Sequence, residues 1–229
     1  MKKALLVSAV AASLAFAENS VVLDNASLGI QAGTIGIGLD YSKKLKALGN
    51  KTILKIAASG FSYNYNYDDT DVSYDTDLKL ANIGLLLDYH PFSNGFYLSA
   101  GAYYNGNGID FKATPTDGTY EINDNTYNAT DIGYLKGETN FNKFAPFIGV
   151  GYDNSIFGNG SLFFSSKLGA IYQGSPNIDL VGVCGSAIKG TAQCDELQND
   201  IEIEQQTLND DADSFKWWPV ISVGLTYKF

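Results

Sequence analysis

Apolar residues alternate with small or polar residues along most of this chain, and the final segment shows the pattern best. In residues 219–229, PVISVGLTYKF, every second position from Ile221 onward is apolar or aromatic. Successive side chains of a strand point to opposite faces, so this segment is predicted to be a strand with one apolar face. An aromatic residue at its end is typical of a strand that faces lipid and finishes in an aromatic girdle. We interpret Leu225, Tyr227 and Phe229 as belonging to the membrane-insertion strand of an outer-membrane barrel.

The same alternation predicts further long strands at residues 28–45, 52–67, 76–89, 96–112, 133–153 and 161–183. With the last strand these make an odd number, whereas a bacterial single-chain barrel needs an even one. Counting back from the last strand places the turn at 46–50 in the periplasm, so another strand is needed at about 21–33, with a reversal near 32–34. The predicted fold is therefore all-β: an eight-stranded antiparallel transmembrane β-barrel with short periplasmic turns and long extracellular loops.

Three local features refine this picture. The aromatic residues at 61, 63, 65 and 67 are out of phase with the apolar residues at 54, 56 and 58, which predicts a bulge near Ser59 and Gly60 and an aromatic ladder at the outer girdle. The loop at 113–131 is expected to hold a small hairpin, with Thr119–Ile122 and 126–128 as its strands. The loop at 184–214 is expected to be partly helical, over 195–208.

The first 17 residues read as a signal peptide. Lys2 and Lys3 precede an apolar stretch at 4–16, and Ala15 and Ala17 provide a small-x-small cleavage site. The alternative, an N-terminal anchor helix, is disfavoured because the stretch is shorter than the ~20 residues that span a bilayer. Residues 1–17 are thus predicted to be removed on export, which leaves one barrel domain at 18–229.

Composition supports a barrel and excludes one class of partner. The chain has 24 Gly, 15 Tyr and 13 Phe, which suits two aromatic girdles around a crowded interior. Its formal net charge is −10, and every basic residue is lysine. A phosphate-binding surface needs a basic patch, so nucleic acid is not an expected partner.

Charged residues at predicted inward positions are the candidate functional residues of the interior. An eight-stranded barrel is only about wide enough for side chains to fill it, so an open aqueous pore is not expected. Inward charges either line a pathway or pair with one another and plug the barrel, because an unpaired buried charge is costly. The candidates are Asp40, Lys55, Asp88, Glu138 and Lys167.

The predicted extracellular loops hold most of the carboxylates. Such a collar either concentrates cations at the mouth, holds divalent ions that bridge to lipopolysaccharide, or is simply a solvated surface. The aspartates at 69–77 lack the Gly and Glu of an EF-hand loop, because Tyr74 and Leu80 occupy those places. Loose calcium binding is the alternative left open there.

No catalytic set emerges from the remaining residues. His90 is the only histidine and lies in a predicted periplasmic turn, and His or Cys clusters that would bind a metal are absent. We therefore expect neither an enzyme nor a cofactor. Cys184 and Cys194 form an even pair in an exported chain, so they are predicted to form a disulfide in the last loop.

The second half of the chain resembles the CarO-type small outer-membrane proteins, the carbapenem-associated ornithine-uptake porins. Four pieces in order carry the resemblance: INDNTY at 122–127, APFIGVG at 145–151, YQGSPNIDL at 172–180 and KWWPV at 216–220. The resemblance implies an eight-stranded barrel and a role in the passage of small, particularly basic, amino acids. It supplies no substrate-binding motif, and the cysteine pair is not a feature associated with the family.

Two functional hypotheses follow for a protein expected in the bacterial outer membrane. The first is a barrel that assists the passage of small, cationic amino-acid-like solutes. The second is a non-transporting envelope protein that serves structural integrity, adhesion or lipopolysaccharide interaction. The expected partners are membrane lipid, lipopolysaccharide and, during insertion, the barrel-assembly machinery. Because a closed barrel has no edge to pair, a monomer is expected.

Overall fold

The computed structural model describes residues 26–68 and 71–229. The signal-peptide prediction at 1–17, and the first residues of the predicted first strand, lie outside the described residues.

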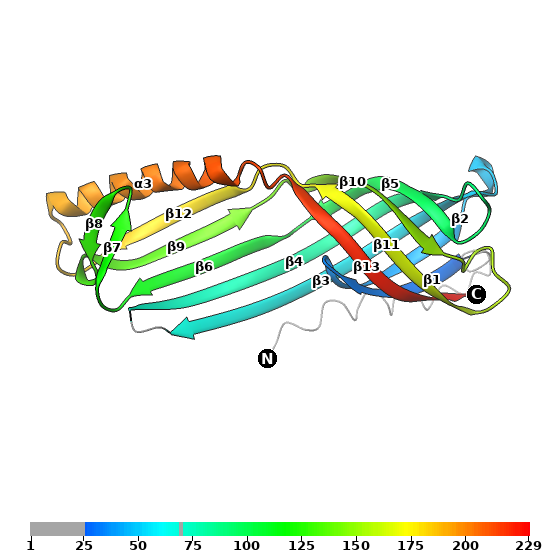
Figure 1. The fold of residues 1–229 in the computed structure, drawn as a ribbon, viewed down its shortest axis with the longest axis horizontal. Helices are drawn as coiled ribbons and strands as arrows, with labels where there is room; N and C mark the ends of the chain where they lie inside the picture. The colour runs from blue at the N-terminus through cyan, green and yellow to red at the C-terminus, as the bar shows by residue number, and fades with distance from the viewer. Residues whose placement is uncertain (1–25, 69–70) are drawn as a thin grey trace.

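Eight antiparallel strands close into a barrel, as predicted (Figure 1). Around the ring, each strand pairs with the next and the last pairs with the first. In ring order the strands are β1 (Ala26–Gly33), β2 (Gly36–Lys44), β3 (Thr52–Asp68), β4 (Val72–Tyr89), β5 (Phe96–Asn105), β10 (Phe144–Asp153), β11 (Leu162–Tyr172) and β13 (Trp217–Lys228). The reversal between β1 and β2 lies one residue beyond the predicted position, and the predicted first strand is present.

Alternation sets the two faces of the barrel. Large apolar side chains on every second residue point outward and form an exposed belt, which would be unstable in water and is the surface that a bilayer covers. On β4, Ile83, Leu85 and Leu87 are outward, and after Ala81 the outward positions become the charged residues Lys79 and Asp77. The apolar belt therefore ends near Ala81, where β4 leaves the membrane.

The interior is narrow because aromatic side chains lie directly over glycines. A Cβ atom at Gly84 would lie 2.5 Å from the Tyr103 ring, and one at Gly149 would lie 2.6 Å from the Phe147 ring. Glycine is thus required where the two walls of a small barrel approach an inward ring.

The predicted bulge near Ser59 and Gly60 is wrong. The pairing of β3 with β4 runs without a register shift from Thr52 to Asp68, so the aromatic residues at 61–67 stay on the face that points into the barrel below. The ladder therefore does not sit in a lipid-facing girdle. Its rings are half-exposed above the membrane, with neighbouring centroids 6.3–6.4 Å apart. The phase change arises because the membrane ends at this point, so the outward face becomes polar.

Three of the predicted long strands are in fact divided, and their outer parts form a second region. The outer half of β4 pairs with β6 (Gly108–Pro115), β6 pairs with β9 (Ile132–Asn140), and β9 pairs with β12 (Asn177–Cys184). Together with the outer half of β3, these strands make a sheet that projects from one end of the barrel (Figure 1). Because long connections are extracellular in this class of protein, this sheet lies outside the cell.

A hairpin and a helix complete the extracellular region. The hairpin has β7 (Thr119–Ile122) and β8 (Asn125–Asn128), as predicted, and its turn residues Asn123 and Asp124 have φ angles of 49° and 61°. Such positive φ angles are those of the tight turns that favour Asn and Asp. Helix α3 (Ala192–Ala212) lies along β12 and is longer than the predicted helical stretch. Among the described residues, no helix is both long and apolar enough to cross a membrane.

Two short 3₁₀ helices lie in connections. The first, η1 (Lys46–Leu48), forms the turn between β2 and β3, at the end of the barrel opposite the extracellular sheet. The second, η2 (Ala129–Asp131), joins the β7–β8 hairpin to β9. Asp131 accepts hydrogen bonds from the Asn128 backbone and side chain and so closes this turn.

Candidate functional site

The periplasmic half of the barrel interior collects charged side chains from five strands. Four of the predicted inward charges, Asp40, Lys55, Asp88 and Lys167, are at most 6% exposed, on β2, β3, β4 and β11. Each has the same odd or even numbering as the buried residues of its strand, so its side chain points inward. Buried charges require partners, so their contacts determine whether this cluster is a plug or a pathway.

Lys55 and Asp88 form the central ion pair. The Lys55 Nζ lies 2.9 Å from the Asp88 Oδ2, and the Ser99 hydroxyl donates to the other carboxylate oxygen at 2.6 Å. The Lys55 Nζ also lies 4.9 Å from the centroid of the Tyr97 ring. Both charges are thus held in a fixed geometry, which is the condition under which a buried pair is tolerated.

Asp153 is a member of this cluster that the sequence reading missed. It ends β10 and accepts hydrogen bonds from the Ser155 N–H at 2.9 Å and the Thr226 hydroxyl at 3.1 Å. The sequence could have indicated this position, because Asp153 continues the series of odd-numbered inward residues Phe147, Gly149 and Gly151. These contacts satisfy the Asp153 carboxylate without a cation.

Asp40 and Lys167 are less completely satisfied. The Lys167 Nζ donates to the Tyr103 hydroxyl at 3.4 Å and lies 6.0 Å from the Phe147 ring centroid. The Asp40 Oδ2 atom is buried and has no hydrogen-bond partner among the described residues. In the part of the interior that the structure describes, three carboxylates therefore face two ammonium groups, and Asp40 has capacity to accept a further donor.

An apolar cluster closes the extracellular half of the interior. Its inward side chains come from strands around the ring and from the β1–β2 turn, and the Tyr103 and Phe147 rings meet edge to face with centroids 5.6 Å apart. We call this cluster the apolar plug; it comprises Ile35, Leu86, Tyr103, Ala145, Phe147, Ile171 and Val220, with Trp218 packed against it.

The space left beside the ion pair is small. A cavity of about 10 Å³ is lined by Ser42, Lys55, Asp88, His90 and Asp153, among others, which is room for about one water molecule. His90 closes its periplasmic side, with its Nδ1 atom 2.7 Å from the Asn94 carbonyl and its ring 4.9 Å from that of Phe157. His90 thus has a structural role in the turn.

The prediction that Glu138 is an interior charge is wrong. Glu138 lies on β9, in the extracellular sheet, where its side chain is 46% exposed and pairs with Lys136. The prediction assumed that one continuous barrel strand spans 133–153. The chain instead forms β9 outside the membrane and enters the barrel only at β10, so parity within β9 does not report on the interior.

Leu225 and Tyr227 of the C-terminal strand β13 and the following residue, Phe229, point outward. All three are about half exposed, and the Tyr227 and Phe229 rings meet edge to face with centroids 5.4 Å apart. These residues therefore lie on the lipid-facing surface at the end opposite the extracellular sheet.

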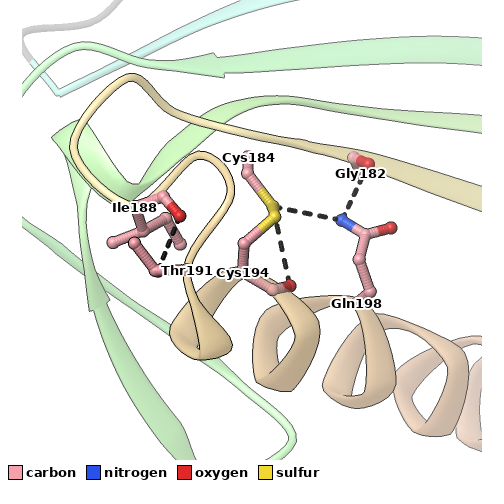
Figure 2. Close-up of a disulfide and its surroundings, with 6 residues drawn as sticks. All are labelled: Gly182, Cys184, Ile188, Thr191, Cys194 and Gln198. Atoms are coloured by element: carbon pink, nitrogen blue, oxygen red, sulfur yellow. Dashed lines mark hydrogen bonds between the residues drawn. A yellow bond between two sulfur atoms is a disulfide. The ribbon is translucent and has the colours of Figure 1, made fainter.

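A disulfide joins the end of β12 to the first turn of α3. Cys184 and Cys194 are bonded, with Cα atoms 5.8 Å apart (Figure 2). One helical turn further on, the Gln198 side chain donates to the Gly182 carbonyl of β12 at 3.1 Å. Closing this short loop constrains the start of the helix against the strand.

Asp200 of α3 connects the helix to the β7–β8 hairpin. This carboxylate is 3% exposed and accepts hydrogen bonds from the side chains of Asn123 at 3.1 Å, Asn125 at 2.9 Å and Tyr127 at 2.5 Å. All three donors lie in the INDNTY segment. The turn of the hairpin is thus shaped to surround one carboxylate, and Tyr127 also belongs to the apolar cluster between the hairpin and α3.

We expect Asp200→Asn to release the hairpin in a pH-dependent manner. The hydrogen bonds, that of Tyr127 foremost, hold the Asp200 pKa below its usual value. A carboxyl whose pKa is lower in the folded state stabilises that state at pH values above its unfolded pKa of about 3.9. This contribution is lost as the pH falls through the folded pKa. Hairpin stability should therefore drop by about 1–3 kcal/mol in the variant at neutral pH.

Amide hydrogen exchange of the β7–β8 hairpin measures this effect. The difference between wild type and variant should shrink toward zero as the pH is lowered below about 4. A difference that stays constant from neutral pH to about pH 2 would show that the charge of Asp200 does not hold the hairpin.

Among residues 26–68 and 71–229, no three His, Cys, Asp or Glu side chains lie close enough together to hold a metal ion. Within the described residues, the carboxylates predicted to form an acidic collar are distributed over the extracellular sheet, the β7–β8 hairpin, η2, α3 and the connections between them. Asp69, the first of the aspartates considered for calcium binding, lies outside the described residues.

Comparison with known proteins shows the fold. No protein-family model matches the sequence, and no curated protein matches it. The crystal structure of Acinetobacter baumannii CarO is similar over 89% of this chain and 97% of that chain, with a TM-score of 0.57 and 23% identity. The structure of Acinetobacter baumannii CarO2 matches over 89% and 98%, with a TM-score of 0.56 and 23% identity. A major outer membrane protein from Thermus thermophilus matches at a TM-score of 0.33 and 13% identity, over 89% and 99%.

The first two structures have a similar fold over most of this chain. At 23% identity they show the fold of this chain. The chain therefore has the fold of an eight-stranded outer-membrane β-barrel similar to that of CarO.

Proposed function

We propose that this barrel assists the passage of small, positively charged solutes across the outer membrane. The observation that carries the proposal is the charged cluster of the interior, in which Asp40 keeps one buried oxygen without a partner among the described residues. In a barrel whose interior served only stability, apolar side chains in place of the buried ions would raise the stability. The extracellular half of this interior is filled in that way. Net negative charge favours a cationic solute, whose ammonium group could donate to Asp40.

In this proposal the apolar plug is the gate. A solute reaches the charged cluster only when the plug side chains move, and within the cluster an incoming ammonium group competes with Lys55 and Lys167 for carboxylates. The proposal includes membrane lipid and lipopolysaccharide as the surroundings, insertion of β13 by the barrel-assembly machinery, and action as a monomer.

Uptake into proteoliposomes tests the proposal. With refolded protein, we expect ornithine and lysine to enter faster than glutamate, and Asp40→Asn to reduce this preference. Glu138→Gln removes a carboxylate outside the interior and serves as the matched control; it should leave the preference unchanged. Equal rates for the three amino acids would overturn the cationic preference.

The second candidate is a non-transporting envelope protein, and the apolar plug favours it. The plug packs buried apolar side chains across the extracellular half of the interior, and the cavity beside the ion pair has room for about one water molecule. Under this hypothesis, the wild-type protein and a variant with a weakened plug both exclude all three amino acids.

A further inference from the structure

The extracellular sheet has two edges, which differ in whether other parts of the chain cover them. One edge is β12, and the other is the outer half of β3, beyond the point where β2 ends. An edge strand presents unpaired backbone N–H and C=O groups, which form a template for pairing with another strand.

Side chains of α3 cover the β12 edge. The Asn209 Oδ1 atom accepts from the Ile178 N–H at 2.8 Å, and its Nδ2 atom donates to the Ile178 carbonyl at 2.8 Å. The Gln205 Oε1 atom accepts from the Leu180 N–H at 2.7 Å. Together with the contact from Gln198, these bonds let the helix occupy the position that a further strand would take.

The β3 edge has no such cover among the described residues. Its last residue paired with β2 is Gly60, opposite Ile37. The Thr52 carbonyl accepts from Leu45 on the β2 side, and backbone direction alternates along a strand, so the even-numbered residues of β3 direct their backbone groups to this side. Beyond Gly60 these are Ser62, Asn64 and Asn66, and no described residue hydrogen-bonds to their backbone on that side.

The usual protections of an edge strand are also missing. Residues 61–67 read FSYNYNY and contain neither lysine nor proline, and the strand has no bulge. Proteins that need to prevent strand addition place such features on exposed edges. This edge is therefore long, regular and uncharged at a site exposed outside the cell.

The two faces beside the edge differ in chemistry. One face carries the half-exposed ladder of Phe61, Tyr63, Tyr65 and Tyr67. On the other face, Asn64 lies in a cross-strand row that continues through four carboxylates on consecutive strands: Asp77, Asp110, Glu138 and Asp179. A strand added at the edge would meet aromatic side chains on one face and a negatively charged row on the other.

We propose that residues 61–67 of β3 bind an extended segment of another polypeptide, which adds to the extracellular sheet as a strand. The segment that fits alternates apolar or aromatic residues with basic residues. Its backbone pairs with Ser62, Asn64 and Asn66, its apolar side chains lie beside the tyrosine ladder, and its basic side chains face the carboxylate row.

A second copy of this chain in the same membrane does not fit the edge. Both copies carry β3 outward from the membrane, so the two strands would pair in parallel. If a two-fold axis along the membrane normal related the two copies, equivalent residues of the two strands would lie at the same height, with their side chains on opposite faces of the joined sheet. In a sheet, residues side by side on neighbouring strands point to the same face, so this pairing is not possible. The occupant is thus a different polypeptide.

Residue-resolved amide exchange tests the pairing directly. In protein reconstituted in nanodiscs of zwitterionic lipid, the amides of Tyr63 and Tyr65, which face β4, should be protected, and those of Ser62, Asn64 and Asn66 should exchange rapidly. Adding a short peptide that alternates tyrosine and lysine should protect the even-numbered amides. Binding that leaves these amides unprotected would overturn strand addition.

Edge variants and matched peptides complete the test. Asn64→Pro removes an N–H that faces the edge without breaking the β4 ladder, so it should weaken peptide binding by about tenfold. Asn64→Ala keeps the N–H and should bind within about twofold of wild type. Equal affinity of Asn64→Pro and wild type would contradict the proposal.

Changes in the peptide provide a test that does not depend on folding of a variant. A peptide N-methylated at alternate residues should lose binding to wild-type protein, and so should a peptide of the same composition without alternation. A peptide that alternates tyrosine with glutamate should bind more weakly than the lysine peptide. Equal binding of the alternating and shuffled lysine peptides would overturn the proposal in favour of nonspecific electrostatic attraction. Peptide-independent pairing of the protein with itself, detected by light scattering, would instead identify a second copy as the occupant.

Discussion

Replacing Asp88 by asparagine should destabilise the barrel by about 3–5 kcal/mol, because it leaves the Lys55 ammonium group buried without its ion-pair partner. Asparagine keeps the shape of the side chain and can still accept a hydrogen bond from the Ser99 hydroxyl. The loss of stability therefore measures the effect of removing the negative charge. Reversible urea unfolding of refolded protein, followed by tryptophan fluorescence and heat-modifiable gel mobility, measures the change.

The double variant Lys55→Met with Asp88→Leu is the informative control. Because burying a charge pair costs desolvation energy, an apolar pair of similar volume should restore stability to about the wild-type level or above it. If Asp88→Asn alone had no effect, Lys55 would have to be hydrated or paired elsewhere, which would argue for water access to the interior.

Phe147→Ala should have the second large effect, through the apolar plug. The Phe147 ring is 4% exposed and covers the backbone at Gly149 and Gly169. Removing it creates a cavity between walls that cannot collapse, because the strands are held in a closed ring, and should cost about 3–5 kcal/mol. If the barrel transports solutes, the same change should raise ornithine uptake into proteoliposomes.

Ile148→Ala provides the matched control for this prediction. Ile148 is the next residue on β10, but it points outward and is 64% exposed. Its truncation should leave both the plug and the uptake rate unchanged. If Phe147→Ala leaves the vesicles impermeable to ornithine, lysine and glutamate, the non-transporting hypothesis becomes the better account.

The barrel itself was predictable because its signal is local. In β13, alternation from Ile221 to Phe229 marks a two-faced strand without knowledge of any neighbour. The even strand number then required a strand before residue 34, and β1 occupies that place. Parity along single strands likewise identified Asp40, Lys55, Asp88 and Lys167 as inward.

Predictions failed where the environment of a strand changes along its length. Residues 96–112, 133–153 and 161–183 were each predicted to be one strand, yet each leaves or enters the barrel part of the way along. Alternation of apolar and polar residues indicates that a strand has two different faces, but it does not indicate which strand lies next to it. This is why Glu138 was assigned to the interior, and why the aromatic residues at 61–67 were explained by a bulge instead of by the end of the membrane.

The amino-acid sequence alone determined which residues share a face, how many strands close the ring and which end of the barrel lies outside, because these follow from a period of two and from loop length. Only the tertiary structure decided how the interior is filled. The Lys55–Asp88 pair, the unpartnered oxygen of Asp40 and the plug around Phe147 join residues from strands far apart in the chain. The covered β12 edge and the open β3 edge likewise depend on strand order, which the pattern of one strand does not contain.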